Sequence, residues 1–261
     1  MRSYEKSHPE KSTLEQKQQS NDTGIVTSSF TVKDAGRNYK KEDGVKSPKS
    51  FIVIVSGGEV RERNYFIRIS NENQFKRIKL DFVAAPRQAA NYLDRAIYKQ
   101  EYYASSQEDE PDRIYIVSDV DNYMNDLLNI KPKCEQRGIH LIISNPCFEI
   151  WLYYGKFNGN PVDFNIPQDN SKISQAFKTY LGQKVKGGVN PKNAIFDIND
   201  AIKNTKSVYQ EDTNGIPNLF STNMFRLAED ILPFIDSEVK RMINEKNQKE
   251  TEHKNALNPE N

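Results

Sequence analysis

Carboxylate side chains gather at two places in this sequence, each just after an apolar run. Asp119 and Asp121 stand two residues apart behind one run, and Glu59 and Glu62 follow another. Carboxylate oxygens are the ligands that hard cations such as Mg²⁺ and Mn²⁺ prefer. Without a cation these carboxylates would repel one another. Since such sites commonly serve phosphodiester chemistry, the residues favour metal-dependent phosphoryl chemistry.

Two other interpretations of these residues stay open. A D-x-D pair occurs often by chance, and acidic residues after strands frequently cap helices. The turn Ser56-Gly57-Gly58 could instead cradle a phosphate on its backbone N–H groups. It lacks the Gly-Lys-Ser/Thr ending of a P-loop and the spacing of a dinucleotide-binding turn, so it is weak evidence for a nucleotide site.

The elements that must position these acids alternate in type. Short apolar runs predict strands at 51–55, 78–83, 113–118 and 139–143, with helical patterns after each of them. This order predicts an α/β fold, a mostly parallel sheet with flanking helices. Because ligands of such sheets bind at the carboxyl ends of the strands, the two acidic turns should converge there.

The chain is predicted to continue without further strands. Helical patterns after residue 155 predict a helical C-terminal region, and polar sequence at both ends predicts disorder. The expected organisation is a disordered arm over 1–48, an α/β core over 49–155, a helical region over 156–243 and a disordered tail over 244–261.

Composition limits the class of protein. The 37 Lys and Arg residues nearly cancel the 36 Asp and Glu residues, so any nucleic-acid groove must be local. No apolar run approaches the length of a membrane span, and no secretory signal opens the chain. The two cysteines, Cys134 and Cys147, are expected to be reduced thiols, which favours a cytoplasmic location.

A third group of polar residues could bind substrate. Asn145 could orient a phosphate and Glu149 could add a carboxylate, although both also suit the start of a helix. Lys184 and Lys186 belong to a basic stretch that could grip a nucleic-acid backbone or simply face solvent. Cys147 is expected to serve packing rather than nucleophilic chemistry.

Several of these segments resemble the RloB family of prokaryotic defence proteins. The turn that starts at Ser56 resembles the family's opening motif, roughly E-G-E-x-T-E-P-N-Y-F, and Asp119-Val120-Asp121 resembles its D-x-D. The segment 144–152, Ser-Asn-Pro-Cys-Phe-Glu-Ile-Trp-Leu, is similar to S-N-P-x-F-E-x-W-L almost without change. A later T-N-x-x-x-L element is similar to Thr222-Asn223 followed by Leu227.

The resemblance implies a Toprim-like sheet and a Mg²⁺- or Mn²⁺-dependent nuclease-like site in antiphage defence, often beside a partner ATPase. It implies that Asp119 and Asp121 bind metal and that Glu59 or Glu62 has the catalytic role. The chain departs from the family where the first Glu of the opening motif falls on Gly57. That Glu is the general acid/base of Toprim enzymes, so a neighbouring carboxylate substitutes or the nuclease is weakened or inactive.

Three hypotheses for function follow. The first is a Mg²⁺-dependent nuclease acting on RNA or DNA. The second is a catalytically degenerate module that binds a nucleic acid or a nucleotide. The third is a non-enzymatic partner of a defence ATPase. Cleavage with and without Mg²⁺ would separate the first hypothesis from the others, and co-purification of an ATPase would support the third.

Overall fold

The computed structural model describes residues 52–58, 60–72, 77–83, 88–105, 111–121, 123–186 and 188–257. All of them belong to the compact unit Lys46–Asn261. The expected arm over 1–48 and the candidate Glu59 lie outside the described residues. Within this part of the chain, no helix is long and apolar enough to cross a membrane.

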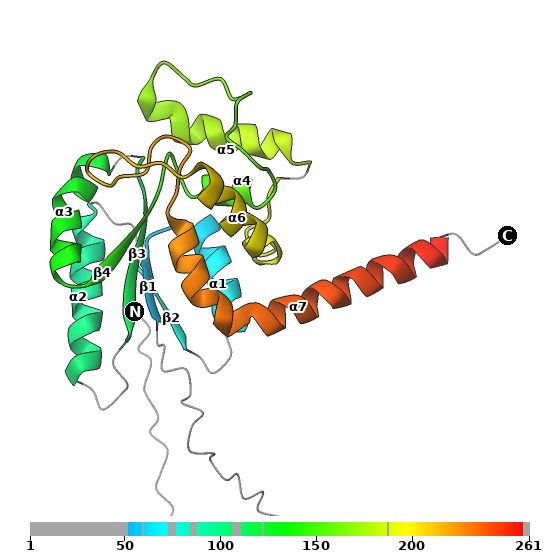
Figure 1. Cartoon of the computed structure of the whole chain (residues 1–261), viewed down its shortest axis with the longest axis horizontal. Helices are drawn as coiled ribbons and strands as arrows, with labels where there is room; N and C mark the ends of the chain where they lie inside the picture. Colours follow the sequence, from blue (N-terminus) through cyan, green and yellow to red (C-terminus); the bar gives the residue numbers. More distant parts are fainter. Residues whose placement is uncertain are drawn as a thin grey trace, which may run out of the picture. The chain divides into compact units, whose positions relative to one another are not determined.

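The centre of the fold is a four-stranded sheet in which every described pair of strands is parallel (Figure 1). Its strands are β1 (Ile52–Ser56), β2 (Ile78–Phe82), β3 (Arg113–Asp119) and β4 (Ile139–Ser144), in the order β2-β1-β3-β4. β1 is apolar and buried along its length, as expected for a central parallel strand covered on both faces. The predicted parallel α/β architecture is confirmed.

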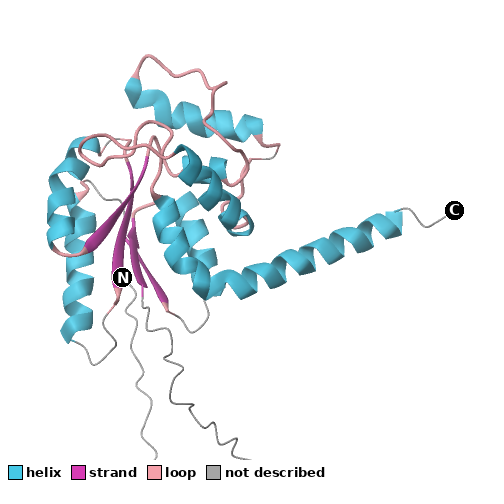
Figure 2. Ribbon diagram, viewed as in Figure 1, coloured by secondary structure: helices cyan, strands magenta, loops and turns pink. Residues whose placement is uncertain are grey.

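Alternate residues of β1 point to opposite faces of the sheet, and different helices cover each face. α2 (Ala90–Ser105) and α3 (Met124–Gln136) pack on the face of Val53 and Val55. α1 (Arg61–Glu72) packs on the other face, with Ile52 and Ile54. Figure 2 shows the two helical layers on either side of the strands.

The helices after β4 complete the core on the α1 face. They are α4 (Glu149–Tyr154), α5 (Ile173–Lys184), α6 (Ile198–Val208) and α7 (Met224–Leu257), with single 3-10 turns before α5 and α6. Phe177, Ile198 and Leu227 belong to the same buried cluster as Trp151 of α4 and Ile54 of β1. The sheet and the helical region therefore share one hydrophobic core. In Figure 1, α5 lies beyond the carboxyl ends of the strands.

β4 is one of the two edge strands, and Asn223 protects its outer side. The Asn223 side chain accepts a hydrogen bond from Ile143 N at 2.6 Å and donates one to Leu141 O at 3.1 Å. Its backbone N–H donates to Ile143 O at 3.3 Å. One asparagine thus satisfies backbone groups that a neighbouring strand would otherwise pair.

Two helices extend further than the sequence suggests. α2 runs to Ser105, into residues 101–112, which their acidic sequence predicts to be a linker. α7 runs to Leu257, through most of the tail expected from residue 244. Ion pairs of Arg241 with Glu245 and of Lys240 with Asp236, both four residues apart, stabilise α7 where the expected tail begins. The polar sequence after them contains neither Pro nor Gly up to Leu257, so nothing local stops the helix.

Candidate functional site

Glu62 is a buried carboxylate in the first turn of α1, 7% exposed. It accepts hydrogen bonds from Ser56 Oγ at 2.7 Å and from the backbone N–H of Gly58 at 3.1 Å. The turn that follows β1 therefore folds around this carboxylate. An acid in the first turn is also favoured by the positive end of the helix dipole. Together these contacts fix Glu62 at the carboxyl end of β1.

The two glycines of this turn lie against different side chains. A Cβ at Gly58 would lie 2.4 Å from Glu62 Oε2, so glycine is what lets the carboxylate approach the turn. A Cβ at Gly57 would lie 2.1 Å from Tyr92 Oη. Gly57 is not among the described glycines with positive φ. The tyrosine ring, rather than the backbone conformation, leaves no room for a side chain at residue 57.

Asp119 ends β3, opposite Ser144 of β4. Its Oδ1 atom is buried and has no hydrogen-bond partner within the described residues. A buried acceptor without a partner is unfavourable, because its lost hydration is not replaced. A cation, a proton or a donor group from a ligand at this atom would remove that cost.

Glu149 brings a third carboxylate to the same end of the sheet. It is the first residue of α4 and is 3% exposed. Its Oε1 lies 3.3 Å from Nε of Arg61, the first residue of α1. Nη1 of the same guanidinium is buried and has no partner among the described residues. Arg61 thus pairs with one carboxylate and keeps a donor unused.

These side chains surround one pocket of about 330 Å³. The acids Glu62, Asp119 and Glu149 line it together with two cations, Arg61 and Lys178 of α5. The remaining lining residues are Gly58, Val60 and Phe148. Side chains from α1, β3, α4 and α5 therefore converge where parallel strands end, the usual ligand position in such a sheet.

Burial and mutual repulsion shift the acids toward their protonated forms. Loss of hydration raises the pKa of Glu62 to about 7, with Glu149 adding to the increase. Loss of hydration also holds the pKa of Asp119 well above its usual range, and the charges of Glu62 and Glu149 add to it. Burial likewise raises the pKa of the Cys147 thiol, as expected for a packing residue. The pocket favours any ligand that brings positive charge to the carboxylates.

Comparison with known proteins agrees with the motifs. The family model for RloB-like protein matches residues 52–231, more than half of the chain. The chain belongs to the RloB family. No curated protein and no solved structure gives a significant match. The match covers the whole sheet, α1 to α6 and the first turns of α7.

The pocket of this RloB-family protein suits a hydrated cation better than a closed metal cage. Among the described residues, no three His, Cys, Asp or Glu side chains are arranged to hold a metal ion together. Mg²⁺ usually retains several waters and binds one or two carboxylates plus phosphate oxygens. The unpartnered oxygen of Asp119 beside the buried Glu62 fits that donor set.

The predicted site residues divide between the pocket and its surroundings. Glu62, Asp119 and Glu149 line the pocket. Asp121 is exposed just past β3, and its charge still contributes to the raised pKa of Asp119. Glu59 lies outside the described residues.

The remaining predicted residues do not line the pocket. The Asn145 side-chain amide donates to Pro217 O at 2.8 Å, which anchors the segment before α4. Lys184 Nζ lies 2.7 Å from Asp163 Oδ2 and 2.9 Å from Tyr180 Oη. Lys186 is exposed beyond the end of α5.

Three residues of the site were not predicted. Arg61 and Lys178 supply the positive charge of the pocket, and Tyr92 fills the space beside Gly57. Arg61 stands in the segment that resembles the opening motif, at the position where the motif has Thr, so the motif did not indicate a basic residue there. Lys178 belongs to the same basic stretch as Lys184 and Lys186, and nothing in the sequence distinguished it from its neighbours. Tyr92 lies 35 residues after Gly57, and no spacing rule connects them.

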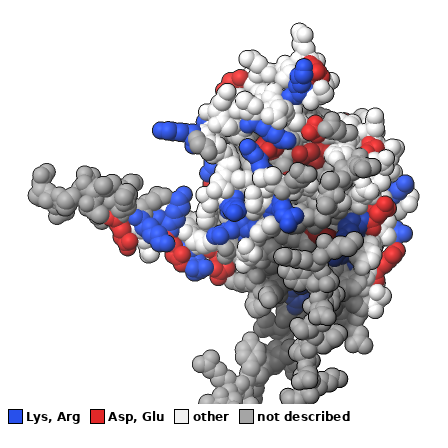
Figure 3. Space-filling model, turned by 180° about the vertical axis from the view of Figure 1, so that it is seen from behind, with Lys and Arg blue, Asp and Glu red and all other residues white. Residues whose placement is uncertain are grey.

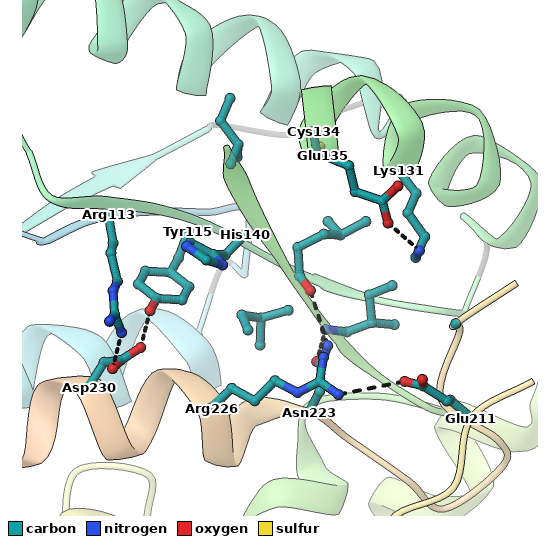
Figure 4. Close-up of a pocket in the computed structure, with 15 residues that line it drawn as sticks. Arg113, Tyr115, Lys131, Cys134, Glu135, His140, Glu211, Asn223, Arg226 and Asp230 are labelled. Atoms are coloured by element: carbon teal, nitrogen blue, oxygen red, sulfur yellow. Dashed lines mark hydrogen bonds and ion pairs between the residues drawn. The ribbon is translucent and has the colours of Figure 1, made fainter. Parts of the chain in front are cut away.

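A second pocket, of about 470 Å³, lies at the outer edge of β4 (Figure 4). Its charged side chains pair with one another. Lys131 Nζ lies 2.5 Å from Glu135 Oε1, and Arg113 pairs with Asp230. No predicted site residue lines this pocket. Acidic and basic side chains also intermix on the surface shown in Figure 3, so local pairing is common in this protein.

Proposed function

We propose that this RloB-family protein is a Mg²⁺-dependent nuclease of antiphage defence that hydrolyses phosphodiester bonds of RNA or DNA. The observation that supports this most directly is the convergence of Glu62, Asp119 and Glu149 on one pocket at the carboxyl end of the sheet. Family membership supports the same chemistry. Structural ion-pair networks also bury charge, but here the Asp119 Oδ1 atom has no partner among the described residues.

Each residue has a role in this proposal. Asp119, with Asp121 beside it, would hold Mg²⁺ or Mn²⁺. When bound, the ion would neutralise charge on the phosphate as a Lewis acid. Glu62 would accept the proton of the attacking water, because its pKa of about 7 lies near the working pH. Its hydrogen bonds from Ser56 and Gly58 hold the carboxylate in a fixed orientation.

A degenerate binding module is the second candidate, and the contact between Gly57 and Tyr92 favours it. The residue that aligns with the family's first Glu has no carboxylate, and the Tyr92 hydroxyl occupies the adjacent space. A protein that had lost hydrolysis could still bind a nucleic acid or a nucleotide with the remaining charged groups of the pocket.

Cleavage of labelled RNA, single-stranded DNA and duplex DNA tests the proposal. We expect degradation with Mg²⁺ or Mn²⁺, none with EDTA, and loss of activity in Asp119→Asn. Asp236→Asn makes the same chemical change on α7, where Asp236 pairs with Lys240, and should stay active. Calorimetric titration with Mn²⁺ should give heat for the wild type and none for Asp119→Asn. Metal binding without cleavage on every substrate would favour the binding module.

A further inference from the structure

The acidic pocket is also lined by two positively charged side chains, and a metal site alone does not explain them. Arg61 and Lys178 come from different helices and line the same 330 Å³ space as the three carboxylates. A positive side chain close to a metal ligand weakens the binding of a metal ion, because like charges repel. Groups of both signs in one small space suit a ligand that also carries both signs.

The Arg61 guanidinium is held in place by Glu149 and has an N–H donor that no described residue uses. Its Nε lies 3.3 Å from Glu149 Oε1, which fixes the plane of the guanidinium. Nη1 is buried without a partner among the described residues. A fixed guanidinium with unused donors is the arrangement that proteins use to bind phosphate oxygens.

Lys178 is held over the pocket by the helix that carries it. Phe177 and Leu181 bury one side of α5 in the core. Ser174, one turn before Lys178, donates a hydrogen bond from its Oγ to Pro146 O at 3.2 Å. Residues four apart lie on the same side of a helix, so this bond turns Lys178 toward the segment that leads to Glu149.

The Lys178 ammonium is half-buried and charged. Burial alone would lower the pKa of Lys178, but Glu149 and Asp119 outweigh it and the net shift is upward. Within the described residues, Lys178 forms neither a hydrogen bond nor an ion pair closer than 4.0 Å. Its positive charge therefore acts on the acids without a direct contact. Its three N–H donors are free to bind another group.

We propose that Arg61 and Lys178 form a phosphate-binding subsite of this pocket, which takes a single phosphate group of a nucleotide or of one nucleic-acid strand. The proposal rests on the proposed function, since the carboxylates opposite would hold the cation that accompanies the phosphate. The pocket, of about 330 Å³, is large enough for one phosphate with part of its sugar.

Calorimetry on the full chain with three probes tests the subsite: Mn²⁺ alone, uridine 5′-monophosphate and uridine, the latter two with saturating Mn²⁺. The two uridine probes differ only in the phosphate. Lys178→Met removes the charge and keeps the length of the side chain. It should weaken binding of the monophosphate by about 10- to 100-fold, the usual effect of losing a charged hydrogen bond.

The same variant should bind Mn²⁺ as well as or better than the wild type, because a positive charge near Asp119 is gone. A purely structural role for Lys178 would weaken both ligands instead. Lys178→Arg should retain monophosphate binding. Lys172→Met is the matched control, since Lys172 is exposed before α5 and pairs with Asp169 at 3.3 Å. It should bind every probe like the wild type.

The outcomes separate this inference from the nuclease proposal. If Lys178→Met binds both ligands like the wild type, or if the wild type binds monophosphate no better than uridine, the subsite is overturned while a metal site stands. If the wild type binds no Mn²⁺ but binds monophosphate through Lys178, the metal proposal fails and the subsite stands. Retained Mn²⁺ binding shows that the variant is folded.

Discussion

At the scale of single residues, the site consists of acids held in an environment that disfavours their charge. Glu62 and Asp119 lose hydration on folding, the charge of Glu149 raises the pKa of both, and the charge of Glu62 also raises the pKa of Asp119. Glu62 Oε2 accepts two hydrogen bonds, whereas Asp119 Oδ1 has no partner among the described residues. Under the proposed function the two acids would therefore have different roles, with Glu62 exchanging a proton and Asp119 binding a cation.

Glu62→Gln should remove part of the pH dependence of stability. The folded-state pKa of Glu62 is about 7, above the ordinary value of 4.5, so the native protein holds this proton more tightly than the unfolded chain. The resulting stability is fully present below about pH 4.5 and is lost as the pH rises through about 7. The loss is on the order of 3 kcal/mol. Urea unfolding at pH 5 and pH 8, with EDTA present, measures it.

Glu245→Gln is the matched control for this change, because Glu245 lies exposed on α7. It should keep the wild-type fall in unfolding free energy between the two pH values. An equal fall in Glu62→Gln would mean that Glu62 does not titrate in this range.

Gly57→Glu alone should lower the thermal midpoint, because the new Cβ would lie 2.1 Å from Tyr92 Oη. Adding Tyr92→Ala opens that space and should recover part of the lost stability. If the protein is a degenerate nuclease, the double variant should cleave about 10²–10⁴-fold faster than the wild type, the range for a positioned general acid/base. Thermal denaturation and the RNA and DNA assays measure the two effects.

Tyr92→Ala alone is the control for this pair. If Gly57→Glu is as stable as the wild type, the tyrosine does not fill the space at residue 57. A folded double variant that remains silent with Mg²⁺ and Mn²⁺ on every substrate would favour the binding module.

At the scale of elements, the strands and their order could be predicted, while the contacts between distant elements could not. Runs such as Ile52–Val55 are too short and too apolar for anything but a covered strand, and parallel order follows from the alternation with helices. The same logic placed Glu62 and Asp119 at one edge of the sheet. The positions of Lys178 and Tyr92 depend on how helices pack across the sheet, which no local pattern encodes.

Asn223 shows the same limit of sequence-based prediction. Its neighbours in the sequence indicate the start of a helix and not a residue that covers the edge of a strand. Asn223→Ala should destabilise the protein by about 2–4 kcal/mol, because Ile143 N and Leu141 O both lose a partner. Asn223→Asp keeps the acceptor for Ile143 N and should fall between alanine and the wild type. Urea denaturation gives the values, and a loss below about 0.5 kcal/mol would show that water replaces the side chain.

At the scale of the whole molecule, the composition of the sequence predicts that the folded part of the chain follows the N-terminal arm. Residues 1–45 are polar and poor in apolar clusters, so they contribute little surface to bury. Their removal should leave the thermal midpoint within about 2 °C of the full chain, and limited proteolysis should stop near Lys46. A protease-resistant arm, or a large fall in the midpoint, would place part of the fold before Lys46.

The asparagine that covers β4 lies 80 residues after the strand it protects. A ribosome adds about 5–20 residues each second, so about 4–16 s separate the synthesis of Ile143 from that of Asn223. During this interval the outer side of β4 has no cover from Asn223, and α7 has not yet joined the core. A sheet that formed during this interval would expose a strand edge able to pair with another chain. Chaperones that bind extended apolar segments should raise the yield of folded protein most during that interval.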